Sequence, residues 1–217
     1  MKPILLTILA LTLAGCSTIH QVGDHITSLD LPSFDVGRDG RTTTIRQGNC
    51  PAVSRVAELA SVYQFTDPAH PLTDELIGVA HLSRVTSTCR KQGKNLKLDL
   101  ALHFGGQLGM KGRIRPGDKP AFVYPYFIAV INQKDQILSK EIFALSLAYD
   151  QDDTQLRQTE TLSQLVPLDG DDPRTYRLLI GFQASGDELV YNRALPEDQL
   201  GIDLETVTVV PAPTPQP

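Results

Sequence analysis

The clearest pattern in this chain is a strict alternation of apolar and polar positions. Leucine or phenylalanine occupies every second position from Leu96 to Phe104, and polar or small residues lie between them. Strand side chains alternate between two faces, whereas a helix would scatter these positions around its circumference. The segment 76–89 before them is rich in β-branched residues, and the polar segment 90–95 contains a glycine. Together these segments predict a long antiparallel hairpin.

A second hairpin is predicted further along the chain. The segment 121–131 is nearly all apolar, as expected for a strand covered on both faces. A polar turn at 132–135 follows, and the segment 137–149 returns. Pro125 lacks a backbone donor, so we expect it at a sheet edge or a bulge.

The remaining elements complete a mainly β architecture. Strands are predicted at 159–167 and 175–183, and residues 53–65 predict an opening strand followed by a short helical turn. The Ser-x-x-Glu pattern at 185–188 predicts one late helix, which Pro196 ends. We therefore expect an all-β fold of about seven strands, a two-sheet antiparallel β-sandwich that is Ig-like or fibronectin-like in architecture.

The first seventeen residues have the order of an export signal. Lys2 precedes an apolar run from Ile4 to Leu13, which is too short to span a bilayer, since a span needs roughly twenty residues. The sequence Leu13-Ala14-Gly15-Cys16 then resembles the lipobox of bacterial lipoproteins. This resemblance implies cleavage before Cys16 and lipidation of that residue. Ser17 in the next position implies the outer membrane of a Gram-negative cell.

These observations define the expected domain organisation. Residues 1–15 are the predicted lipoprotein signal peptide, and 16–47 a lipidated N-terminus with a polar, flexible tether. The β-sandwich domain is expected at 48–210. Residues 211–217 are proline-rich and predict a disordered tail.

Composition narrows the class of partner and the compartment. The net charge of −5 argues against nucleic acid, and the absence of tryptophan disfavours a platform that stacks sugars. With Cys16 lipidated, Cys50 and Cys89 remain, and an even pair in an oxidising compartment predicts a disulfide. A metal site is the alternative for these two cysteines, but neither a Cys-x-x-Cys motif nor a nearby pair of histidines supports it.

A second resemblance covers most of the predicted domain. It is to a group of uncharacterised Gram-negative envelope lipoproteins without assigned activity. It implies export and supports the fold, and it transfers no functional residue. The segments that carry it are Cys50-Pro51, 125–130, Gly181-Phe182-Gln183 and Tyr191-Asn192-Arg193.

The sequence contains no catalytic motif of the common hydrolase, zinc-protease or P-loop types. The histidines are scattered, and His20 and His25 fall in the predicted tether. His81 and His103 fall on the two strands of the first hairpin. They either face each other and bind a metal or occupy exposed polar positions.

The segment 105–119 is the most suggestive loop. Its five glycines permit positive φ angles and favour an anion-binding nest of backbone N–H groups. One hypothesis is contact with an anionic envelope surface, made of lipid headgroups, lipopolysaccharide phosphates or peptidoglycan carboxylates. The alternative is a solvated, flexible connection. The cations of this segment are Lys111, Arg113, Arg115 and Lys119.

Two further groups of residues are weaker candidates. The aromatic cluster Tyr124, Tyr126 and Phe127 suggests either an edge-strand recognition patch or core packing. Two aspartate clusters suit calcium by their spacing but also suit ordinary turns, and the calcium hypothesis gains if both lie at the same end of the sandwich. The aspartates are Asp150, Asp152, Asp153, Asp169, Asp171 and Asp172.

We therefore predict a non-enzymatic, lipid-anchored cell-envelope protein that needs no cofactor. It faces the periplasm from the outer membrane as a structural or adaptor module, with an envelope protein or the cell wall as partner. The alternative is a periplasmic carrier of a small ligand or metal.

Overall fold

The structure is a computed structural model that describes residues 43–45, 48–168 and 170–196. The chain divides into two units, Met1–Asp35 and Val36–Pro217, and every described residue belongs to the second. The signal peptide, Cys16, most of the tether, Asp169 and the proline-rich tail lie outside the described residues. The predictions for these parts stay predictions.

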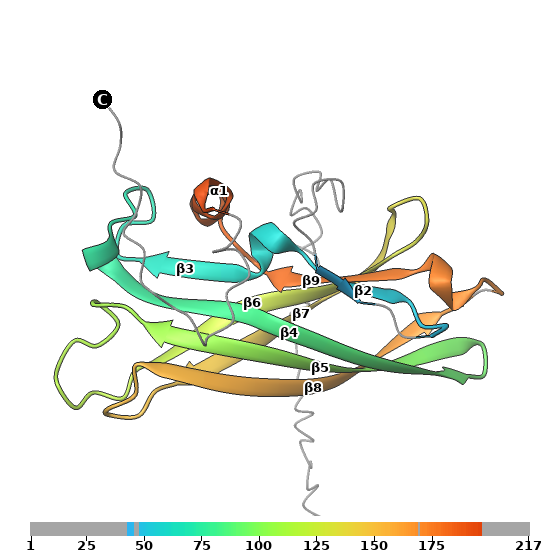
Figure 1. Ribbon diagram of the computed structural model, residues 1–217, viewed down its shortest axis with the longest axis horizontal. Helices are drawn as coiled ribbons and strands as arrows, with labels where there is room; N and C mark the ends of the chain where they lie inside the picture. Colours follow the sequence, from blue (N-terminus) through green and yellow to red (C-terminus); the bar gives the residue numbers. More distant parts are fainter. Residues whose placement is uncertain (1–42, 46–47, 169, 197–217) are drawn as a thin grey trace, which may run out of the picture. The chain divides into compact units, whose positions relative to one another are not determined.

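The described strands form two sheets that pack face to face, as Figure 1 shows. Sheet A has the order β1-β2-β9-β6-β7, and sheet B has the order β3-β4-β5-β8. The strands of sheet A are β1 (Thr43–Ile45), β2 (Ala52–Arg55), β9 (Arg177–Phe182), β6 (Ala121–Ile131) and β7 (Ile137–Ala148). The strands of sheet B are β3 (Ser61–Phe65), β4 (Leu76–Gln92), β5 (Asn95–Leu108) and β8 (Gln155–Pro167).

The predicted two-sheet sandwich is thus confirmed, with two differences in detail. The described residues form nine strands rather than about seven, and β2 pairs with β9 in parallel. The predicted strand and helical turn at 53–65 are β2 and a 3₁₀ turn, η1 (Ala57–Leu59), but β3 follows as a further strand. At η1 the chain crosses between the sheets, because Val56 N donates to Ile180 O of sheet A and Leu82 N of sheet B donates to Ala60 O.

The first predicted hairpin is β4–β5, and its alternating residues build the core. Gln92 pairs with Asn95 across a tight turn in which Gly93 has a φ of +62°. The four leucines of β5 from Leu96 to Leu102, and Phe104, are all at most 3% exposed. They pack against inward-facing residues of sheet A, including Tyr126 and Phe182, whose rings lie 5.1 Å and 5.8 Å from that of Phe104.

Pro125 lies neither at a sheet edge nor at a bulge, so that expectation was wrong. Its strand, β6, is an interior strand between β9 and β7. The Pro125 carbonyl accepts from Gln183 N at 2.8 Å, just beyond the end of β9. Because the N and O atoms of one residue point to the same neighbour in an antiparallel ladder, the missing donor falls where β9 has ended.

The aromatic cluster beside Pro125 is buried. Tyr124 and Tyr126 are each 1% exposed, and Phe127 is 4% exposed. Tyr124 and Tyr126 face sheet B, whereas Phe127 lies on the opposite face of β6 beneath the Lys140 ammonium, 4.9 Å from its ring centroid. The hypothesis of an exposed recognition patch on an edge strand was therefore wrong.

The predicted late helix is α1 (Gly186–Ala194), and it begins with the expected capping box. Glu188 N donates to Ser185 Oγ at 3.2 Å, and Ser185 N donates to Glu188 Oε2 at 2.6 Å. Asn192 Nδ2 donates to the carbonyls of Glu58 and Ser61, both at 2.8 Å, so α1 covers the free edge of β3. No helix among the described residues is long and apolar enough to cross a membrane.

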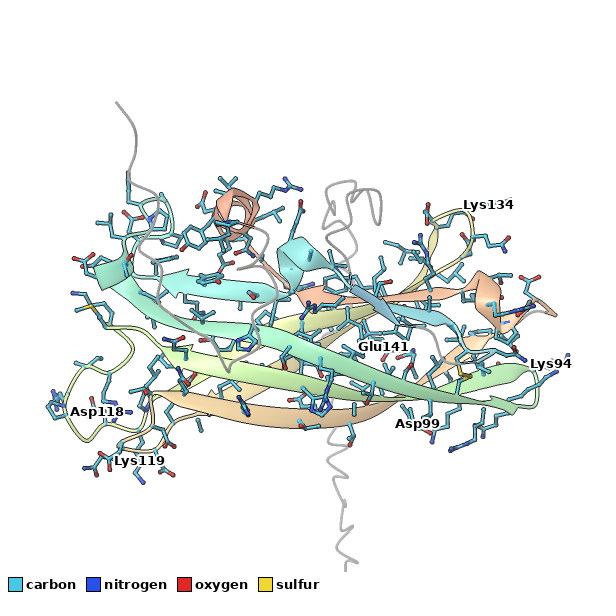
Figure 2. All side chains as sticks on the ribbon, viewed as in Figure 1. Lys94, Asp99, Asp118, Lys119, Lys134 and Glu141 are labelled. Atoms are coloured by element: carbon cyan, nitrogen blue, oxygen red, sulfur yellow. A yellow bond between two sulfur atoms is a disulfide. The ribbon has the colours of Figure 1, made fainter. Side chains whose placement is uncertain are left out.

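Two other edge strands, β7 and β8, carry polar side chains that point toward the interior of the sandwich. Tyr126 Oη donates to Glu160 Oε2 of β8 at 2.6 Å, and Gln164 Nε2 of β8 donates to Glu141 Oε1 of β7 at 2.8 Å. Figure 2 shows Glu141 in this region. Polar groups turned inward at an edge discourage pairing with strands of other molecules.

The predicted disulfide is confirmed. The Sγ atoms of Cys50 and Cys89 are 2.01 Å apart. Cys50 lies just before β2 of sheet A, and Cys89 lies on β4 of sheet B. The disulfide therefore links the two sheets.

Candidate anionic-surface contact site

The loop 109–120 connects β5 to β6 and contains the four predicted cations. Gly105 and Gly106 belong to β5 rather than to this loop. Figure 2 places Asp118 and Lys119 of the loop at one end of the sandwich and Lys94 at the opposite end. We call residues 109–120 the β5–β6 loop.

The glycines of the β5–β6 loop allow close packing. A Cβ atom on Gly109 would lie 2.1 Å from Leu76 O, and one on Gly112 would lie 2.3 Å from Ile77 O. Gly109 N and Lys111 N donate to these carbonyls of Ile77 and Leu76, at 2.9 Å each. Of the five glycines in the segment, Gly117 has a positive φ, +89°. Gly109 and Gly112 therefore seat the loop on β4 rather than form the expected nest.

The structure brings two of the loop cations onto the first aspartate cluster. Arg113 Nη2 donates to the carbonyls of Asp150 and Asp153 at 2.9 Å and 2.7 Å. Lys119 Nζ pairs with Asp150 Oδ1 at 2.8 Å, which raises the pKa of Lys119 and lowers the pKa of the Asp150 carboxyl. Sequence reasoning treated these two groups as separate sites, and the structure joins them.

The other two cations differ in their surroundings. Lys111 Nζ pairs with Glu75 Oε1 at 3.3 Å. The hydroxyl of Thr66 and, secondly, this ammonium lower the pKa of Glu75. Arg115 donates its backbone N–H to Asp118 Oδ2 at 2.9 Å, and its guanidinium makes no ion pair with the described residues. Arg115 is therefore the loop cation best placed to meet an external anion.

Two apolar side chains of the loop project into solvent. Ile114, between Arg113 and Arg115, is 89% exposed, and Met110 is 74% exposed. Sequence reasoning missed both, although an isoleucine between two arginines in a predicted loop indicates an exposed apolar side chain. Apolar side chains with adjacent cations are typical of surfaces that enter the headgroup region of a bilayer.

The described aspartates of the two clusters lie at opposite ends of β8, so the condition that strengthened the calcium hypothesis does not hold. In the second cluster, Asp172 caps a short 3₁₀ turn (Pro173–Thr175) and pairs with Arg174, while Asp171 accepts from the Tyr176 hydroxyl at 3.3 Å. The described residues contain no group of three or more histidines, cysteines, aspartates or glutamates placed to hold a metal ion.

His81 and His103 do not face each other across the hairpin. His81 pairs with Gly105, and His103 pairs with Arg84. His103 Nδ1 instead lies 3.0 Å from Thr159 Oγ1 of β8. The two-histidine metal hypothesis therefore has no geometric support.

Comparison with known proteins supplies no further assignment. No family model matches this chain, and no curated protein or solved structure matches it.

Proposed function

We propose that this protein is a non-enzymatic, lipid-anchored module of the cell envelope, held by a lipid on Cys16 and facing the periplasm. In this proposal the β5–β6 loop contacts an anionic lipid surface. The observation that carries the contact is that Ile114, 89% exposed, is next to Arg115, whose guanidinium forms no ion pair within the described part of the chain.

Two features of the chain support the proposed location. The disulfide between Cys50 and Cys89 suits an oxidising compartment such as the periplasm. The lipobox-like sequence at 13–16 ends in the cysteine that lipidation requires. A lipid on that cysteine would supply stable membrane residence, so the loop needs only a weak contact of its own.

The expected strength of the loop contact follows from its side chains. Burying one isoleucine contributes about 2 kcal/mol, and one arginine near an anionic lipid surface contributes about 1 kcal/mol. Removing Ile114 should therefore weaken binding about 30-fold, and removing Arg115 about fivefold.

Vesicle binding of the unlipidated Cys16→Ser protein tests this proposal. We expect cosedimentation with phosphatidylglycerol vesicles, and much less with phosphatidylcholine vesicles. Ile114→Ser and Arg115→Ser should each weaken binding. Val190→Ser is the matched control, because Val190 is an exposed apolar residue (68%) on α1 rather than on the loop. Equal losses from Ile114→Ser and Val190→Ser would contradict a specific role for the loop.

A further inference from the structure

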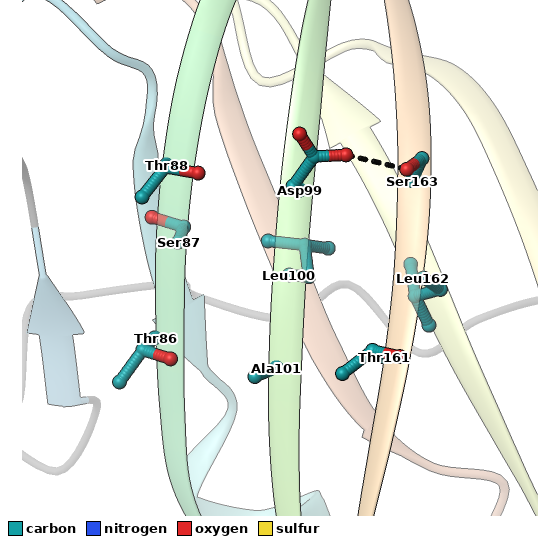
Figure 3. A pocket seen from close by; sticks show the side chains of 9 residues that line it. All are labelled: Thr86, Ser87, Thr88, Asp99, Leu100, Ala101, Thr161, Leu162 and Ser163. Carbon is teal, nitrogen blue, oxygen red and sulfur yellow. Dashed lines mark hydrogen bonds between the residues drawn. The ribbon is translucent and has the colours of Figure 1, made fainter.

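The outward-facing side chains of β4, β5 and β8 form a shallow groove of about 530 Å³ on the outer face of sheet B. Figure 3 shows its rows, which the strand register aligns. Thr86, Ala101 and Thr161 form one row. Thr88, Asp99 and Ser163 form the next. These side chains are short, so the groove is open and its surface is rich in hydroxyl groups.

Cations flank this groove along the strands. In the row beyond the Thr86 row, Arg84 lies opposite His103 in the strand register. In the row after that one, Arg157 lies opposite Gly105. Beyond the Thr88 row, on the other side of the groove, Arg90 lies opposite Lys97 in the strand register. All three arginines are exposed.

These five rows carry a local excess of positive charge. Asp99 is the one carboxylate among their outward-facing residues, against three arginines and Lys97. The chain as a whole has a net charge of −5. The outer face of sheet B is therefore locally positive, although the net charge of the protein is negative.

Asp99 organises the cationic row beside it. Its carboxylate lies 3.0 Å from Arg90 Nη1 and 3.3 Å from Lys97 Nζ, and it accepts a hydrogen bond from the Ser163 hydroxyl. These partners lower the pKa of Asp99, with the Ser163 hydroxyl as the largest cause. The carboxylate thus fixes two cations and one hydroxyl at the rim of the groove.

The spacing of the cations indicates the size of the ligand. His103 and Lys97 mark the flanking rows on β5, and a strand rises about 3.3 Å per residue, so these rows are about 20 Å apart. A small anion cannot contact both rows. An extended ligand with repeated negative charges can.

The lining of the groove indicates the chemistry of the ligand. Threonine and serine hydroxyls donate and accept hydrogen bonds, as sugar hydroxyls do. None of the lining residues is aromatic, so nucleic-acid bases have nothing on which to stack. We propose that the outer face of sheet B binds an extended, carboxylate-bearing polysaccharide, with its carboxylates on the flanking cations and its hydroxyls on the threonine rows.

Calorimetric titration of the full chain in neutral detergent with polygalacturonate oligomers tests this proposal. Oligomers that reach from Arg84 to Arg90 should bind, and shorter ones should bind much more weakly. The double variant Arg84→Ser, Arg157→Ser should weaken binding about tenfold. Lys134→Ser is the matched control, because it removes an exposed cation from the β6–β7 turn (Figure 2).

A second pair of variants fills the groove without changing its charge. Ala101→Leu adds volume on the central strand, and Thr161→Leu does so at an exposed position of edge strand β8. Both should weaken binding while Tm stays unchanged, and Thr161→Leu keeps the test valid if Ala101→Leu disturbs the fold. If the leucine variants bind normally, the interaction is non-specific electrostatics and the proposal is wrong.

Other ligands provide the remaining outcomes. Equal binding of neutral dextran or of a single-stranded oligonucleotide would overturn the proposal, as would complete displacement of the glycan by anionic vesicles or no binding at all. The proposal does not depend on the β5–β6 loop. Ile114→Ser should leave glycan binding unchanged, so a failure of one proposal can be told from a failure of the other.

Discussion

Tyr124 and Tyr126 form a matched pair that tests how this core holds hydroxyl groups. Both lie on β6, face the core and are 1% exposed. The Tyr126 hydroxyl donates to Glu160 at 2.6 Å, whereas the Tyr124 hydroxyl has no partner among the described residues. A hydrogen bond to a charged group contributes about 1.5–3 kcal/mol, and an unpartnered buried polar group costs about 1–3 kcal/mol. The same change to phenylalanine should therefore have different effects at the two positions.

We expect Tyr126→Phe to lower the free energy of unfolding by about 2 kcal/mol, because the Glu160 carboxylate loses a donor. In a domain of this size 1 kcal/mol shifts Tm by roughly 2–4 °C, so Tm should fall by about 4–8 °C. Tyr124→Phe should leave Tm unchanged or raise it slightly. Scanning calorimetry at pH 7 measures both variants. An equal loss of stability in both would refute the reasoning.

Alkaline pH gives a second readout for Tyr124. Burial, and secondly the Glu188 charge, raises the pKa of Tyr124 to about 12 from its ordinary value of 10.0. Between pH 10 and pH 12 the unfolded chain releases the Tyr124 proton and the folded protein keeps it. The free energy of unfolding is therefore unaffected by this group below pH 10 and falls as the pH rises through 12. Two pKa units correspond to about 2.7 kcal/mol. Tyr124→Phe should therefore reduce the loss of stability over this range, and an unchanged alkaline limb would contradict the assignment.

Three further predictions concern packing and the acidic turns. Replacing Cys50 and Cys89 by serine opens a loop of 39 residues and should cost about 4 kcal/mol, seen as a Tm lower by about 8–16 °C. An unchanged Tm would contradict a stabilising role for the disulfide between the two sheets. Asn192→Ala removes two hydrogen bonds to backbone carbonyls and should cost about 2 kcal/mol, whereas Arg193→Ala, which loses an exposed ion pair with Glu58, should cost under about 1 kcal/mol. Millimolar calcium should leave Tm unchanged, and a rise would restore the calcium hypothesis.

The parts of the fold that were readable from sequence are those fixed by local periodicity. The alternation from Leu96 to Phe104 identified β5, because one buried face requires an apolar residue at every second position. The capping box at Ser185 identified the start of α1, because its two hydrogen bonds are local. Cys50 and Cys89 identified the disulfide, because they are the two cysteines that remain once Cys16 is assigned to lipidation.

The parts that were missed depend on contacts between distant segments. The strand β3 was hidden because the chain crosses from one sheet to the other at η1, within a few residues. Gly109 and Gly112 looked like flexible positions, but they are required by the approach of β4. The pairing of Lys119 with Asp150 joins two loops 31 residues apart. The cationic outer face of sheet B exists only once the register aligns three strands.

The central claim is that Cys16 anchors this domain in the cell envelope. Intact-mass spectrometry of the full chain, purified from the membranes of a Gram-negative host, tests it most directly. The account predicts a mature protein that begins at Cys16 and carries a diacylglyceryl group on its thiol and an acyl group on its amine. A protein that is released in soluble form, or that retains an unmodified Cys16, would contradict the claim.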